Sequence, residues 1–210
     1  MNKNNIILIA ELVGTFLLTM AVLMGVNPFV ALGVLMLIIG GISGSHVNPA
    51  VSIGLAAVKK INATKMAMYW VAQLAGALIA KVVYEYISAS DMSGLKFNFT
   101  AIDTKSLVIE ILGGAIFLMG GVLALNQGLK GIQLAAAFGG SLFLGCMLGG
   151  VVNPALAFGL QNTSVSSIIG PLIGGVLGAY VAGWMVPLAM EAQTKVRATA
   201  PAKVKVRRSK

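Results

Sequence analysis

The chain has 210 residues, of which 58% are hydrophobic and 10% are charged. Soluble domains have about 45–50% apolar and about 25% charged residues. This composition and the mean hydropathy of +0.92 therefore indicate a membrane protein. The single cysteine (Cys146) and the single histidine (His46) exclude an intrachain disulfide framework and leave almost no ligands for a zinc site. Most classes of soluble enzyme are thereby excluded.

Six apolar segments are predicted to cross the bilayer as helices, because about 20 apolar residues are needed to span it. In chain order they are residues 6–26, 29–44, 66–87, 107–125, 131–148 and 166–188. Two shorter segments, 48–58 and 153–160, are too short to cross, and each begins with Asn-Pro. Asn is a preferred N-cap and Pro costs nothing in the first helical turn, so both are predicted to be half-helices.

Most basic residues fall on one side of these spans. Twelve of the fifteen do so, namely Lys3, Lys59, Lys60, Lys65, Lys130 and the seven in residues 191–210, whereas Lys81, Lys96 and Lys105 fall on or toward the other. Cytoplasmic loops carry an excess of Lys and Arg, so we expect a multi-pass cell-membrane protein with both termini cytoplasmic. Residues 91–106 would form an extracellular connecting loop. Residues 191–210 are predicted to be a disordered, basic cytoplasmic tail rather than an arm for nucleic acid or anionic lipid.

The two halves of the chain repeat each other. Glu11-Leu-Val-Gly aligns with Glu110-Ile-Leu-Gly, and Asn48-Pro49-Ala50 aligns with Asn153-Pro154-Ala155. Each unit holds three spans, an odd number, so the second copy must be inserted upside down relative to the first. We therefore expect one inverted repeat at residues 1–90 and another at 107–190, with the functional site where the interrupted helices meet.

Several motifs resemble the major intrinsic protein family, the aquaporins and aquaglyceroporins. The resemblance covers residues 6–188 and rests on AELVGTF, SGSHVNPAVSIG, YWVAQLAGALIA, the second Asn-Pro-Ala and IIGPLIGGVLGA. It implies an all-α membrane protein with six transmembrane helices plus two half-helices in two inverted three-helix repeats. It further implies a passive channel for water and small neutral solutes. It also implies a homotetramer in the lipid bilayer, in which each protomer has its own pore. No cofactor, metal, nucleic-acid partner or catalytic residue is expected, so the chain is predicted not to be an enzyme.

Both Asn-Pro-Ala motifs are predicted to line the pore: Asn48, Pro49, Ala50, Asn153, Pro154 and Ala155. Each half-helix would point its positive end toward the bilayer centre, and irregular backbone at that depth persists only beside a polar cavity. The amides of Asn48 and Asn153 would then donate to a passing oxygen. The two facing dipoles would oppose protons and cations there.

Two acids, Glu11 and Glu110, lie inside apolar spans, where ionisable groups are usually paired or functional. A proton relay would make the protein a transporter, but no intramembrane base is placed to exchange protons with them. The resemblance implies instead that both carboxylates brace the half-helix loops by accepting backbone N–H bonds. His46, two residues before Asn48, is interpreted as a loop-stabilising or pore-wall residue rather than a metal ligand.

The outer selectivity filter departs from the family pattern. In most relatives the residue three after the second Asn is an arginine, whereas here it is Leu156. By spacing, the other filter positions fall at Ser141, at Gly150 and, on the second helix, at Pro28 or Phe29, of which we take Phe29. Because these side chains are uncharged and small or apolar, we expect a wider and less polar filter than in a strict water channel.

The solute is not fixed by these residues. Ala157 stands where glycerol-conducting relatives commonly have Asp, so water, glycerol, urea, ammonia and metalloid acids all remain candidates. The alternatives to a small-solute channel are a strict water channel, a coupled secondary transporter and a structural membrane protein with a vestigial pore. A transporter would need an intramembrane ionisable pair or a sodium cage. Residues Asn98-Phe-Thr100 also form a glycosylation sequon in the external loop.

Overall fold

The computed structural model describes residues 2–88, 95–97 and 99–199, which form eight helices and no strand. In chain order they are α1 (Lys3–Leu23), α2 (Pro28–Ser43), α3 (Pro49–Ala57), α4 (Ala63–Ile87), α5 (Thr104–Asn126), α6 (Gly131–Cys146), α7 (Pro154–Gly159) and α8 (Val165–Thr199). Helices α1, α4, α5 and the Val165–Pro187 part of α8 are long and apolar enough to cross a membrane. Helices α2 and α6 are apolar but shorter, with 16 residues each.

Short polar side chains start these helices. The side-chain oxygens of Asn48, Asn62, Asp103 and Asn153 each accept a backbone N–H at the beginning of α3, α4, α5 and α7. Such caps satisfy donors that the first helical turn leaves without partners. The two half-helices therefore begin where the Asn-Pro pattern predicts. The Asp103 carboxylate accepts hydrogen bonds from the Ser106 side chain and from the Ser106 backbone N–H. These bonds, the side-chain one first, hold the pKa of Asp103 below its ordinary value.

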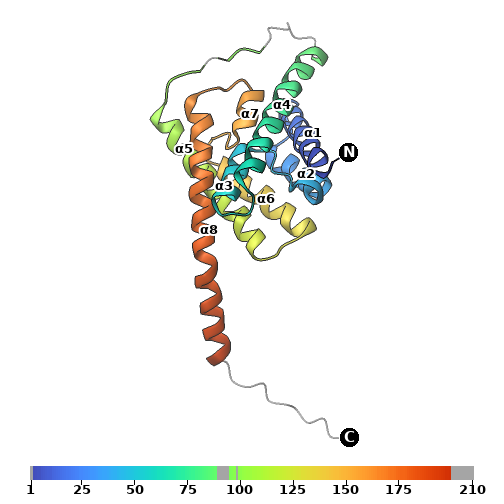
Figure 1. Cartoon of the computed structure of the whole chain (residues 1–210). Helices are drawn as coiled ribbons and strands as arrows, with labels where there is room; N and C mark the ends of the chain where they lie inside the picture. Colours follow the sequence, from blue (N-terminus) through green and yellow to red (C-terminus); the bar gives the residue numbers. More distant parts are fainter. Residues whose placement is uncertain (1, 89–94, 98, 200–210) are drawn as a thin grey trace.

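The two repeats are built on the same helix pairing, which Figure 1 shows. Helix α1 packs along α4 in the first repeat, and α5 packs along α8 in the second. Glycine permits both contacts, because a Cβ on Gly76 would collide with the Leu12 carbonyl and one on Gly174 with the Ile111 carbonyl. Small residues of this kind let helix backbones approach closely in membranes.

Each half-helix also packs against the last helix of the opposite repeat, α3 on α8 and α7 on α4. The α3–α8 contact is reciprocal, since a Cβ on Gly54 would lie 2.7 Å from the Gly175 carbonyl and one on Gly175 would lie 2.6 Å from the Ala50 carbonyl. In Figure 1 both half-helices accordingly lie among the long helices. This exchange fixes the position of each half-helix relative to the other repeat.

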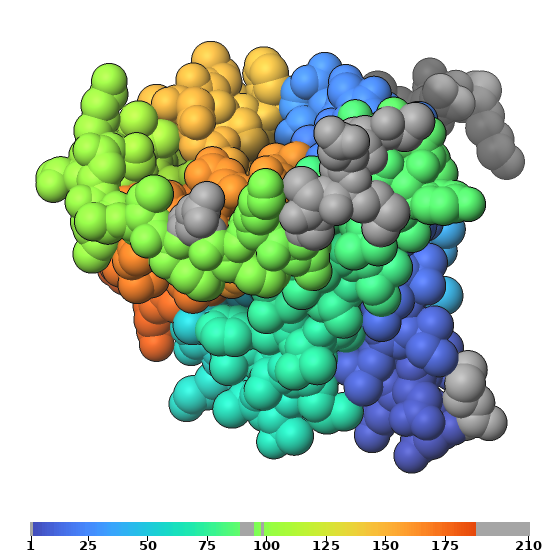
Figure 2. Space-filling view, turned by 90° about the horizontal axis from the view of Figure 1, so that it is seen from above, coloured from blue at the N-terminus to red at the C-terminus, as the bar shows by residue number. Residues whose placement is uncertain are grey.

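The connection between α4 and α5 crosses one end of the bundle. Figure 2, seen from above, shows residues 95–97 and 99–103 running over this face toward α5. The Val165 N–H donates to the Thr100 carbonyl, and the Asp103 N–H donates to the Ser166 hydroxyl. These bonds attach the described part of the loop to the start of α8. Asn98 of the sequon lies outside the described residues.

Helix α8 continues beyond the bundle (Figure 1) and ends at Thr199. The expectation of a disordered tail from residue 191 is therefore wrong for residues 191–199. Ala, Glu, Gln, Lys and Arg dominate this stretch, and they are strong helix formers, so the helix propagates past the apolar segment. Residues 200–210 lie outside the described part.

Candidate functional site

The starts of the two half-helices are joined by a reciprocal pair of hydrogen bonds. Asn48 Nδ2 donates to the Val152 carbonyl at 2.9 Å, and Asn153 Nδ2 donates to the Val47 carbonyl at 3.0 Å. We call these four residues the half-helix junction. It connects positions 104 and 106 residues apart in sequence, one from each repeat.

Each junction asparagine uses its oxygen on its own helix. Asn48 Oδ1 accepts the Ala50 N–H at 2.8 Å, and Asn153 Oδ1 accepts the N–H groups of Ala155 and Leu156 at 3.0 and 3.2 Å. A primary amide has two N–H donors, of which one is used at the junction. One N–H of each amide therefore remains for a ligand at the meeting point of two helix N-termini.

The residues that supply the junction carbonyls have an uncommon backbone conformation. Val47 has φ 42° and Val152 has φ 58°. A positive φ is strongly disfavoured for a β-branched residue and costs about 1–3 kcal/mol. It persists where the surroundings hold the backbone in place, and buried carboxylates do so on both sides of the junction.

The Glu11 carboxylate accepts four hydrogen bonds, from the end of α2, from the first loop and from α4. Its Oε1 accepts the Ser43 hydroxyl at 2.6 Å and the His46 N–H at 2.9 Å. Its Oε2 accepts the Val47 N–H and Gln73 Nε2, both at 2.8 Å. Because the side chain is fully buried, these charge-assisted bonds replace the water that the carboxylate has lost. The bonds from His46 and Val47 fix the backbone that leads into α3, and those from Ser43 and Gln73 hold the carboxylate in place.

Glu110 has the equivalent position in the second repeat but fewer partners. Its two oxygens accept the N–H groups of Val151 and Val152, each at 2.8 Å. It also borders a cavity of about 120 Å³ whose wall includes Ser106, Asn162 and Gly150. A Cβ at Gly150 would lie 2.9 Å from Glu110 Oε2, so a larger residue there would displace the carboxylate from its present position. The second loop is therefore held less tightly than the first.

His46 is fixed from two sides. Its Nδ1 lies 3.1 Å from the Ser52 hydroxyl, and its ring meets the Tyr69 ring edge-on at 4.8 Å between centroids. The Tyr69 hydroxyl in turn donates to the Ser43 carbonyl at 2.6 Å. The histidine is therefore held by packing and hydrogen bonds at the approach to the junction. Among the described residues, no cluster of three or more His, Cys, Asp or Glu side chains could hold a metal ion.

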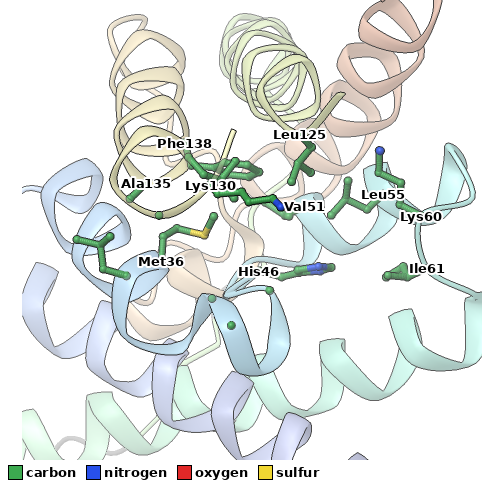
Figure 3. Close-up of a pocket in the computed structure, with 16 residues that line it drawn as sticks. Met36, His46, Val51, Leu55, Lys60, Ile61, Leu125, Lys130, Ala135 and Phe138 are labelled. Carbon is green, nitrogen blue, oxygen red and sulfur yellow. The ribbon is translucent and has the colours of Figure 1, made fainter. Parts of the chain in front are cut away.

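A cavity of about 550 Å³, which we call the vestibule, extends outward from His46 (Figure 3). Its apolar wall comes from α2, α3, α5 and α6 and includes Met36, Val51, Leu55, Leu125, Leu134 and Phe138. The polar side chains in the lining are those of His46, Lys60 and Lys130. No acidic residue is among the described lining residues. The vestibule therefore combines a largely apolar wall with two lysines and no described acid.

The structure places the predicted filter residues in separate surroundings. Phe29 meets Phe143 of α6 edge-on at 4.9 Å between centroids and borders a groove between α2 and α6. Ser141 donates its hydroxyl to the Ala137 carbonyl of its own helix at 2.6 Å. Gly150 lies against Glu110, as described above, and Leu156 is buried in the first turn of α7. Phe29 and Gly150 thus border different cavities.

Three contributors to the site were not assigned from the sequence. Gln73 Nε2 bonds both Glu11 and the Ser52 hydroxyl, Tyr69 holds the first loop, and Trp70 Nε1 donates to the Pro49 carbonyl at 3.0 Å. All three lie on α4 within the stretch YWVAQ. Polar side chains inside an apolar span are the signal that could have identified them.

Comparison with known proteins accords with this architecture. The family model described as "Major intrinsic protein" matches residues 22–185, most of the chain. This chain belongs to the major intrinsic protein family. The predicted family and the predicted all-α fold, with six longer helices and two half-helices in inverted repeats, are therefore confirmed.

Relatives of this chain include an aquaporin and a probable glycerol uptake facilitator. The chain is 31% identical over 165 residues to aquaporin AqpM of Methanothermobacter marburgensis, covering 67% of this chain and 67% of that protein. It is 29% identical over 180 residues to a probable glycerol uptake facilitator protein of Thermotoga maritima, covering 70% and 77%. Its fold matches the X-ray structure of the aquaglyceroporin from Plasmodium falciparum with a TM-score of 0.69 at 21% identity, covering 90% of this chain and 99% of that one.

Proposed function

We propose that this major intrinsic protein is a passive membrane channel that conducts water together with small uncharged solutes. The half-helix junction is the observation that carries the proposal. It brings two helix N-termini and two amide N–H donors together, which suits a neutral solute offering an oxygen acceptor. Relatives named as an aquaporin and as a probable glycerol uptake facilitator support a channel for this class of solute.

The outer filter is proposed to be centred on Leu156; spacing gives Phe29, Ser141 and Gly150 as its other positions, although Phe29 and Gly150 border different cavities. Leu156 follows the second half-helix start directly, and its buried aliphatic side chain offers no donor to a solute. A donor-poor filter replaces the hydrogen bonds of water incompletely but tolerates the carbon skeleton of a polyol. We therefore expect glycerol to permeate alongside water.

Stopped-flow light scattering on proteoliposomes tests this filter. Wild-type vesicles are expected to shrink rapidly in a sucrose gradient and to re-swell rapidly in a glycerol gradient. In Leu156→Arg the guanidinium adds donors and narrows the path, so glycerol re-swelling should slow by about tenfold or more while water flux persists. Leu156→Met, which changes shape without charge, is the matched control and should keep glycerol flux.

Two outcomes would separate the alternatives. Slow glycerol re-swelling in the wild type, with fast shrinkage in sucrose, would mean a strict water channel that works without a filter arginine. Unchanged glycerol flux in Leu156→Arg would mean that the filter lies elsewhere. Solute uptake that required a proton or sodium gradient would indicate a coupled transporter.

We also infer the assembly and orientation implied by the family resemblance, namely a homotetramer in the cell membrane with both termini cytoplasmic. The bias of Lys and Arg toward one side supports this orientation. Large apolar side chains on the outer faces, such as Val71, Ile132 and Trp184, suit contact with lipid or with another protomer. Light scattering of the detergent-solubilised protein measures the number of protomers, and a monomer would contradict the inference.

A further inference from the structure

The vestibule carries positive charge that the outer filter lacks. Leu156 stands at the predicted arginine position, and the three arginines of the chain lie at positions 197, 207 and 208. By contrast, Lys60 and Lys130 both line the vestibule, as His46 does. Lys60 follows α3 and Lys130 precedes α6, so each repeat contributes one lysine to the wall.

Figure 3 indicates how the two lysines lie. The Lys130 side chain extends across the cavity toward Val51 of α3, whereas Lys60 lies beside Leu55. Lys130 is the N-cap residue of α6, between Gly128 and Gly131, both of which have positive φ. This turn leads into α6, and the lysine side chain reaches into the cavity from it.

No described acid neutralises these charges within the vestibule. Both oxygens of Glu11 are occupied by the first half-helix loop, and Glu110 holds the second loop. Lys81, in contrast, pairs with Glu85 at 3.2 Å near the end of α4. An unneutralised ammonium beside a low-dielectric wall acts on ions more strongly than it would in bulk water.

We propose that Lys130, together with Lys60, is a charge-selectivity element that repels cations from the vestibule and thereby replaces the missing filter arginine. This inference rests on the proposed channel function. A cation entering from this end meets two ammonium groups before it reaches the positive ends of α3 and α7. A neutral solute carries no net charge and passes the same groups without this cost.

Flux through proteoliposomes containing the full-length protein tests this element. Potassium release and osmotic water permeability are measured on the same vesicles for wild type, Lys130→Met, Lys60→Met and the double variant. Met approximates the length of the lysine chain but removes the charge. Lys59→Met is the matched control, because Lys59 neighbours Lys60 in sequence and does not line the vestibule. Lys130→Arg retains the charge.

The double variant is expected to release potassium about tenfold faster than wild type at low ionic strength, with water permeability within about twofold. Lys130→Arg and Lys59→Met should match wild type. The difference should shrink at high ionic strength, because the Debye length falls from about 30 Å at 0.01 M to about 3 Å at 1 M.

Unchanged potassium release in the double variant, with water permeability retained, would overturn the charge-selectivity element and leave the channel function intact. An equal increase in Lys59→Met would also overturn it, since the effect would then belong to general surface charge. If the Met variants failed to fold, Lys130→Glu provides the same test with a polar side chain and should raise potassium release further. Wild-type vesicles that pass neither water nor glycerol would instead contradict the proposed function, and this inference with it.

Discussion

At the scale of single residues, the two buried carboxylates occupy equivalent positions in the two repeats but accept different numbers of hydrogen bonds. Glu11 accepts four hydrogen bonds and Glu110 accepts two. Both hold the strained valine that presents its carbonyl to the opposite asparagine. Their positions were predictable from the repeat, but the number of partners depends on Ser43 and Gln73, which come from other helices.

This asymmetry predicts unequal effects of removing the charge. Glu11→Gln places an amide N–H against groups that themselves donate, so we expect a loss of about 3 kcal/mol of folding stability. Glu110→Gln meets fewer donors and should cost about 1.5 kcal/mol. Thermal unfolding of the purified protein in detergent compares the two. If Glu110→Gln proved the more damaging variant, the difference in the number of hydrogen bonds would not determine loop stability.

At the scale of helices, close approach between α1 and α4 and between α5 and α8 depends on glycine. The apolar segments were predicted from composition because hydropathy is a local property that needs no partner. The backbone that each glycine meets was not predictable, since the chain holds 26 glycines and many occupy open positions. Packing against a second helix decides whether an added methyl group is tolerated.

Gly174→Ala and Gly140→Ala are a matched pair that tests whether contact with a neighbouring backbone makes a glycine necessary. A Cβ at Gly174 would collide with the Ile111 carbonyl, and backbone cannot yield as a side chain can, so we expect a loss of about 2–3 kcal/mol. A Cβ at Gly140 of α6 meets nothing within 4 Å, so alanine there should be neutral or stabilising by up to about 1 kcal/mol. Unfolding temperatures measure both, and equal effects would argue against backbone contact as the cause.

At the scale of the whole molecule, the half-helix junction links the two repeats through Asn48 and Asn153. Each asparagine donates to the backbone that precedes the other half-helix. The junction is therefore both the contact between repeats and the centre of the proposed pore. Loosening one side should disturb the other.

Asn48→Ala and Asn153→Ala test this linkage. Each variant removes a helix cap and leaves a junction carbonyl without its partner, so each should cost about 2 kcal/mol and lower water permeability. Because both bonds stabilise the same contact, the double variant is expected to lose less stability than the two single losses together. Strictly additive losses would mean that the two half-helices are held independently.

The sequence by itself determined the family, the number of helices, the positions of the half-helices and the pairing of the two repeats. These follow from hydropathy, from Asn-Pro at helix starts and from the similarity of the two halves, all of which can be read from the sequence without knowledge of the fold. The tertiary structure alone decided the asparagine–carbonyl bonds, the partners of Glu11, the position of Lys130 across the vestibule and the separate surroundings of Phe29 and Gly150. The physical reason is distance along the chain: these features form between residues that only folding brings together, through donors, acceptors and volumes that no local pattern specifies.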